Sequence, residues 1–72
     1  MIYYRFRVAP GFQAIELLES LGLPVKDVTA EVFGVNGRGE AFDVAYRAAA
    51  IKAVSTLAAE DIPFVFAPYD GG

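Results

Sequence analysis

Apolar and polar positions alternate at the start of the chain. The even-numbered residues from Ile2 to Val8 are all apolar or aromatic, whereas Tyr3, Arg5 and Arg7 occupy the odd positions. A period of two is typical of a strand with one face against the core. We therefore expect the side chains of Tyr3, Arg5 and Arg7 to lie on the face that the core does not cover.

Two later segments have helical periodicity. Residues 12–21 repeat apolar side chains every three or four positions, and Gly22 follows where a left-handed helix end is favourable. Residues 44–59 repeat in the same way and contain seven alanines, the residue with the highest helix propensity. Asp43 precedes this second helix and is predicted to cap its first turn.

Three further segments are predicted to be strands. Residues 27–35 alternate, and residues 62–67 form a run rich in phenylalanine and valine. Asn36 and Gly37 between them give the strongest short signal for a β-hairpin turn, because both residues tolerate positive φ. Residues 38–42 are then expected to return as a short third strand.

The predicted order of elements is β-α-β-β-α-β. With right-handed crossovers, this order gives an α+β fold with the ferredoxin-like arrangement: a two-layer sandwich in which an antiparallel sheet carries two helices on one face. We expect residues 1–72 to form a single domain and residues 68–72 to form a short C-terminal tail.

Composition argues against several kinds of chemistry. The chain has no cysteine and no histidine, which removes the usual zinc ligands, the thiolate nucleophile and the commonest catalytic base. The nearest carboxylate pairs are Glu16 with Glu19 and Glu60 with Asp61, and neither has a predicted reason to be desolvated. We therefore expect no catalytic residues, no bound metal and no cofactor.

The charge balance limits the partners. Six basic and nine acidic residues give a net charge of −3, which disfavours binding to a nucleic-acid backbone. The chain has no apolar run of about 20 residues, and its first residues alternate in a way unlike a signal peptide. We expect a cytoplasmic protein without a membrane partner, in the host cytoplasm if a phage encodes it.

Part of the chain resembles the second half of a double-stranded-RNA-binding domain, in which a strand leads through a Gly-x-Gly turn into an alanine-rich helix. The matching positions are Gly37, Gly39, Ala45, Ala49, Ala50, Ala53, Val54 and Leu57, within residues 32–57. The family binds RNA with lysines at the start of that helix, where this chain has Phe42, Asp43 and Tyr46. The resemblance therefore implies a packing pattern without the RNA contact.

Two other resemblances bear on function. Residues 62–68 followed by Gly71 and Gly72 are similar to the C-terminus of sulfur-carrier and ubiquitin-like proteins, which would imply a covalently modified tail. In its size and its lack of cysteine and histidine, the chain also resembles the small single-domain proteins of tailed bacteriophages. That likeness implies an accessory protein, encoded by a phage or mobile element, that acts on a host or phage macromolecule.

The expected binding surface is the open sheet face. It is predicted to display Tyr3, Arg5, Arg7, Glu31 and Phe33. Aromatic and arginine side chains together suit a protein partner, which could be a host protein or a second copy of the chain. The alternatives are single-stranded nucleic acid stacked on the rings, and an ordinary half-solvated face in which Arg5 pairs with Glu31 across strands.

Overall fold

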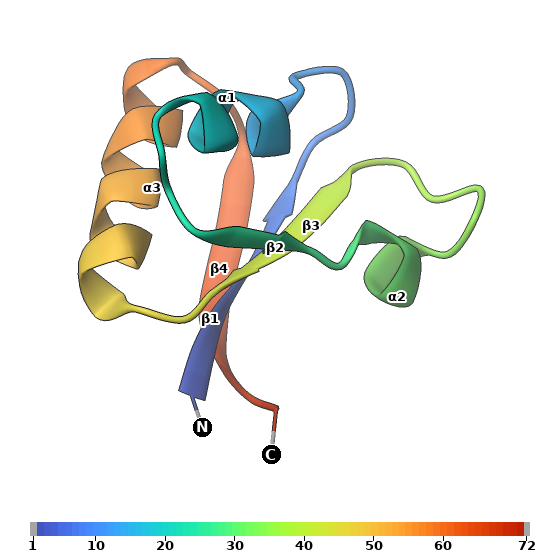
Figure 1. Cartoon of the computed structure of the whole chain (residues 1–72). Helices are drawn as coiled ribbons and strands as arrows, with labels where there is room; N and C mark the ends of the chain where they lie inside the picture. The colour runs from blue at the N-terminus through green and yellow to red at the C-terminus, as the bar shows by residue number, and fades with distance from the viewer. Residues whose placement is uncertain (1, 72) are drawn as a thin grey trace.

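The computed structural model describes residues 2–71 of the chain. Its elements, shown in Figure 1, are β1 (Ile2–Val8), α1 (Ala14–Ser20), β2 (Val25–Asp27), α2 (Thr29–Phe33), β3 (Glu40–Val44), α3 (Arg47–Ala59) and β4 (Phe64–Asp70). None of the helices within this described range is long and apolar enough to cross a membrane.

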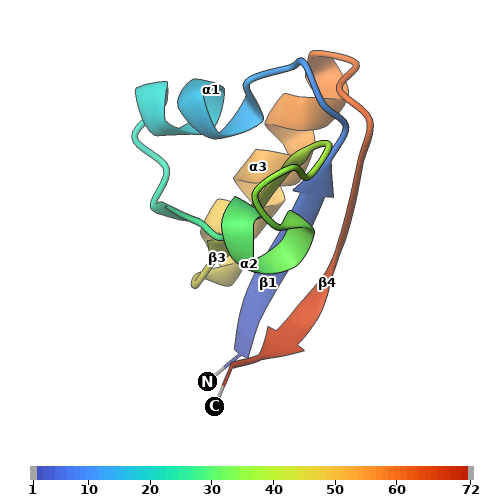
Figure 2. The ribbon, with the colours of Figure 1, turned by 90° about the vertical axis from the view of Figure 1, so that its right-hand side faces the viewer.

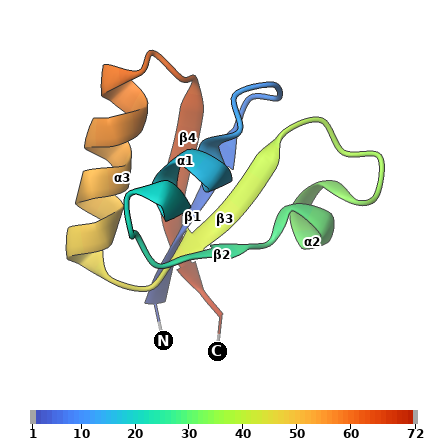
Figure 3. The same cartoon turned by 45° about the horizontal axis from the view of Figure 1, so that its top comes forward.

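The four strands form one antiparallel sheet in the order β2-β3-β1-β4. Helices α1 and α3 cover one face of this sheet, while α2 lies beyond β3 on the side away from them (Figures 1 and 3). The predicted α+β, two-layer sandwich with an antiparallel sheet and two helices on one face is confirmed. The short helix α2 is an addition that the sequence analysis did not predict.

A row of aromatic rings crosses the sheet beneath the helices. Phe6 is fully buried at the centre of β1, opposite Phe42 on β3 and Phe66 on β4. The Phe6 ring stacks on those of Phe42 and Phe66 with centroids 4.9 and 5.1 Å away. Phe6 and Val8 are buried in the core and Tyr4 packs against it, so the predicted alternation is confirmed from Tyr4 onwards, whereas Ile2 is 50% exposed.

Helix α1 ends where the sequence predicted a stop. Gly22 has φ of 78°, and its N–H donates to the Glu19 carbonyl at 2.9 Å, while the Leu23 N–H donates to the Leu18 carbonyl at 3.1 Å. These two bonds satisfy carbonyls of the last turn that would otherwise lack a partner. Leu23 can then fold back and pack against the core.

The start of α1 depends on a residue far away in the sequence. The carboxylate of Glu40, on β3, accepts hydrogen bonds from the backbone N–H groups of Ala14 at 2.6 Å and Ile15 at 3.1 Å. It therefore performs the role of an N-terminal cap from a neighbouring strand.

The prediction of a strand over residues 27–35 is wrong, because most of these residues form α2 and the connection after it. Strand β2 ends at Asp27, whose carboxylate accepts a hydrogen bond from the Thr29 N–H at 2.9 Å. Hydrogen bonds from Thr29 also hold the pKa of Asp27 below its ordinary value. The Thr29 hydroxyl donates to the Ala41 carbonyl at 3.2 Å and accepts from the Ala41 N–H at 3.1 Å. A side chain thus replaces the strand ladder and lets the backbone turn into α2.

The prediction of a β-hairpin turn at Asn36 and Gly37 is also wrong. Residues 34–39 connect α2 to β3, and neither Asn36 nor Gly37 has positive φ. Strand β3 occupies residues 40–44 instead of 38–42, so Asp43 lies within the strand and does not cap α3. Gly39 has φ of 147°, and a Cβ on it would lie 2.6 Å from the Val8 carbonyl oxygen, so this position requires glycine.

The end of the chain is more ordered than predicted. Strand β4 continues to Asp70, which pairs with Ile2, so residues 68–70 belong to the sheet and not to a tail. Gly71 lies against Tyr3, since a Cβ built on Gly71 would be 2.7 Å from Cε2 of that ring. Gly72, the second glycine of the predicted carrier-like terminus, lies outside the described residues.

Candidate interaction surface

Arg5 lies at the centre of the sheet face that α1 and α3 leave open, and Asp43 holds it there. Its Nε donates to Asp43 Oδ1 at 2.8 Å and its Nη2 donates to Oδ2 at 2.9 Å. The Arg5 guanidinium also lies 3.9 Å from the centroid of the Tyr69 ring. The hydrogen bonds to the Asp43 carboxylate raise the pKa of Arg5 above its already high ordinary value.

The predicted pairing of Arg5 with Glu31 is therefore wrong. β1 and β3 place Arg5 opposite Asp43, whereas Glu31 belongs to α2. Asp43 is only 7% exposed, and its ion pair with Arg5 is a fixed part of the sheet. The sequence does not indicate this partner, because Asp43 precedes a helical pattern and is expected at a helix start, where its carboxylate would face backbone amides.

One hollow of the open face surrounds this ion pair. It has a volume of about 240 Å³, and Tyr3, Arg5 and Glu31 line it together with Lys26 and Asp43. Glu31 comes from α2, so this helix brings its side chain to the place where the sequence analysis expected a strand residue. Its lining contains two positive side chains, Arg5 and Lys26, and two negative ones, Glu31 and Asp43, so the hollow offers a ligand no single sign of charge.

A second hollow lies farther along β1 and differs in character. It has a volume of about 390 Å³, and Arg7, Phe33, Arg38 and Val65 are among its lining residues. Val65 is 63% exposed, and Phe33 lies against Gly39 with ring atoms 3.4 Å from a Cβ built there. Within the described chain, neither Arg7 nor Arg38 forms an ion pair, and no acidic residue lines this hollow.

The five predicted surface residues are thus divided between two hollows. Tyr3, Arg5 and Glu31 line the first, whereas Arg7 and Phe33 line the second. Arg38 is not among the predicted surface residues, because residues 38–42 are expected from the sequence to form the short third strand. Phe33 of α2 and Arg38 of the segment after it reach the open face, since they line a hollow with Arg7 and Val65. Figure 2 shows the sheet from the side on which α2 and this segment lie.

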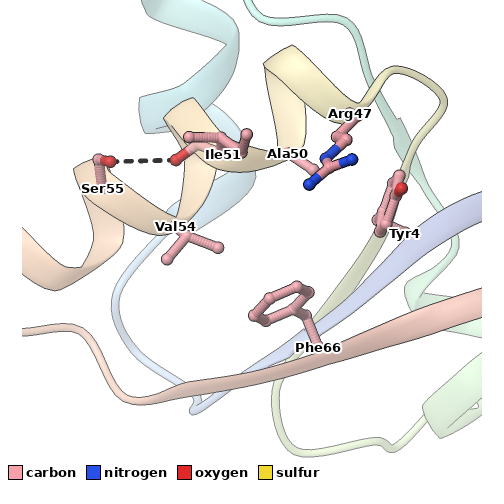
Figure 4. A pocket seen from close by; sticks show the side chains of 7 residues that line it. All are labelled: Tyr4, Arg47, Ala50, Ile51, Val54, Ser55 and Phe66. Carbon is pink, nitrogen blue, oxygen red and sulfur yellow. Dashed lines mark hydrogen bonds between the residues drawn. The ribbon is translucent and has the colours of Figure 1, made fainter.

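An apolar groove lies on the other face, between α3 and β4 (Figure 4). Its volume is about 410 Å³, and Ile51, Val54 and Phe66 form much of its lining. Ile51 is 58% exposed and Phe66 is 47% exposed, although Phe66 belongs to the stacked aromatic row. Arg47 and Tyr4 lie together at one end of the groove (Figure 4). Helix α3 therefore leaves the β4 side of the sheet incompletely covered.

The carboxylates considered for catalysis lie at the surface. Glu16 and Glu60, which belong to different predicted pairs, line one open hollow together with Ser20, and all three residues are exposed. The described residues contain no group of three or more acidic side chains placed to hold a metal ion. Exposed carboxylates of this kind remain solvated.

Comparison with models of known protein families, with curated proteins and with solved structures finds no match for this chain. Any functional conclusion must therefore come from the surfaces described above.

Proposed function

We propose that this protein is a non-catalytic protein-interaction module that binds an acidic segment of a partner protein in the hollow between α2 and β4. One observation carries the proposal. Arg7 and Arg38 line this hollow beside the exposed Val65, without an acidic residue among its lining. Arginine and aromatic side chains are enriched at the centres of protein interfaces, and Arg7, Arg38 and Phe33 bring both kinds to this hollow.

Charge makes an acidic segment the best occupant. The chain as a whole carries a net charge of −3, so two arginines that line one hollow stand out from the rest of the molecule. A carboxylate can accept two parallel hydrogen bonds from one guanidinium, which makes Arg7 and Arg38 suited to Asp or Glu side chains. Phe33, which lines the same hollow, would contact an apolar residue between those carboxylates.

The same geometry favours a protein over nucleic acid. A phosphate backbone would need a run of positive charge across the open face, but Asp43 neutralises Arg5 at its centre and Glu31 lies beside it. An origin in a phage or mobile element, and a host macromolecule as the partner, remain predictions from the resemblance. Covalent use of the terminal glycines is a prediction of the same kind.

Affinity capture with matched charge variants tests the proposal. Wild-type protein, the double variant R7E/R38E and the control K52E are immobilised and exposed to the same mixture of candidate proteins. We expect proteins retained by the wild type and by K52E to be lost with R7E/R38E, because Lys52 is exposed on α3 outside this hollow. A partner captured equally by all three forms would contradict the proposed site.

A gel-shift series at low salt distinguishes binding of single-stranded nucleic acid from binding of an acidic protein segment. Salt-sensitive binding of single-stranded RNA or DNA by the wild type, lost in R7E/R38E, would show that the arginines hold phosphates instead of carboxylates. We expect no shift.

A further inference from the structure

We propose that a second copy of this chain pairs with the outer edge of β4, giving a two-fold dimer with one continuous sheet. This inference goes beyond the proposed function, because it uses the backbone edge of β4. Of the residues that line the hollow between α2 and β4, the dimer would cover Phe64 and Val65 but not Arg7, Arg38 or Phe33. It rests on the direction of the β4 backbone groups, on the two prolines that flank residues 64–67 and on the exposed apolar side chains of that segment.

The backbone direction follows from one hydrogen bond. The Ala9 N–H donates to the Pro63 carbonyl at 3.2 Å, so Pro63 turns its backbone groups towards β1. In an antiparallel pair this direction alternates, so Val65 and Ala67 also face β1. The backbone groups of Phe64 and Phe66 therefore point outwards. No other strand within residues 2–71 pairs with this edge of β4.

Two prolines limit the edge that is available. Pro68 is one of the outward-facing positions. Because it has no N–H, its presence removes no hydrogen bond between β4 and β1, but it prevents a second strand from pairing with β4 beyond this point. Pro63 precedes the strand. Between the prolines, residues 64–67 carry no charge, although charged side chains are the usual protection of an edge strand.

This edge is complementary to itself. In an antiparallel pair centred on Val65, Phe64 of one copy lies opposite Phe66 of the other, and the reverse. Each such pair exchanges two backbone hydrogen bonds, so the register forms four bonds and uses every available N–H between the prolines. Val65 then lies opposite Val65 of the second copy, as a pair without mutual hydrogen bonds and with closely spaced side chains.

The side chains fit the same register. Val65, 63% exposed on the open face, would be covered by its own symmetry mate. On the helix face, Phe66, 47% exposed, would contact Phe64 of the second copy and extend the stacked row of Phe42 and Phe6 by one ring. Val65 and Phe66, near the start of β4, would thus both be removed from water.

Charge complementarity on α3 supports a second copy as the occupant. The two-fold axis runs the two α3 helices antiparallel. The start of α3 in one copy, which carries Arg47, therefore faces the C-terminal end of α3 in the other copy, which Glu60 and Asp61 follow. The exposed outer residues of α3 include Ala48, Ile51 and Ser55, which are small or apolar and would allow the helices to approach.

Charge-swap variants at Val65 test this dimer. Sedimentation equilibrium is measured over a range of concentrations for the wild type, V65K, V65E and an equal mixture of these two variants. The control V35K makes the same substitution at a fully exposed position in the loop before β3. We expect wild type and V35K to approach twice the 7.7 kDa chain mass as concentration rises.

Each single variant would place like charges opposite each other, so we expect dimerisation to weaken at least about tenfold in V65K and in V65E. The mixture should regain the dimer, because Lys then faces Glu across the axis. A wild type that stays monomeric at all concentrations would overturn the proposal. So would variants that dimerise like the wild type, or a mixture that fails to recover.

Hydrogen exchange of the wild type provides a readout without any variant. As concentration rises, the amides of Phe64 and Phe66 should gain protection, while those of α2 and of residues 34–39 should be unaffected. R7E/R38E should dimerise normally even if it loses its partner, so failure of this dimer and failure of the proposed function are distinguishable. Unchanged exchange at Phe64 and Phe66 in a dimeric sample would place the interface elsewhere.

Discussion

The ion pair between Arg5 and Asp43 shows how a single residue pair shapes the open face. Two charges lie side by side in the middle of a sheet, with side-chain exposures of 18% and 8%. Arginine suits this position because its guanidinium meets the carboxylate through two parallel hydrogen bonds, while its flat face lies over Tyr69. The pair organises the face, and it also removes Arg5 from the set of side chains that can bind a partner.

We expect D43N to destabilise the fold by about 2–3 kcal/mol, because the Arg5 charge would remain half-buried without its counter-ion. The control is D61N, at an exposed position whose positive φ of 56° asparagine tolerates. Urea denaturation followed by circular dichroism measures both. If the free energies of unfolding of D43N and D61N differ by less than about 0.5 kcal/mol, the ion pair does not stabilise the sheet as proposed.

At the scale of elements, the structure explains which predictions from sequence succeed. Strand β1 is predictable because its alternation agrees with what the fold buries: Phe6 and Val8 are in the core. The end of α1 is predictable because Gly22 acts within its own turn. Both features depend on residues close together in the chain, and such residues can be recognised from a single sequence.

The failures involve contacts between distant residues. Residues 28–33 alternate in the sequence as a strand would, but the hydroxyl of Thr29 bonds to the backbone of Ala41 and ends the ladder. Because Ala41 is twelve residues away, nothing near Thr29 indicates this contact. The positions of Glu31 and Phe33 depend on it, which is why the sequence analysis named both residues as part of the surface but assigned them to the wrong element.

Helix α1 gives a prediction at the element scale. It has seven residues, too few to be stable alone, and Glu40 binds the N–H groups at its start from β3. We expect E40A to cost about 1–2 kcal/mol and E40Q less, since an amide oxygen can still accept one of the bonds. E19Q, an exposed change within α1, is the control.

Thermal unfolding monitored in parallel for E40A, E40Q and E19Q measures these effects. If E40A and E19Q unfold at the same temperature, the start of α1 does not depend on Glu40.

At the scale of the whole molecule, the sheet is asymmetric between its edges. Strand β2 is only three residues long and leads directly into α2, whereas β4 is seven residues long, with an unpaired edge within the described chain and exposed apolar residues on both faces. The open-face hollow and the proposed dimer edge both lie on β4. Both proposed binding surfaces therefore lie on the same side of the molecule. Both also depend on which backbone groups of β4 point towards β1 and which point outwards.

Amide hydrogen exchange at single-residue resolution, in dilute protein where dimers are absent, measures that orientation most directly. In a chain of L-residues, the side to which an amide points fixes the face on which its side chain lies. The account predicts slow exchange for Val65 and Ala67, which bond to β1, and fast exchange for Phe64 and Phe66. The reverse alternation would place Val65 under the helices and contradict both the binding hollow and the dimer edge.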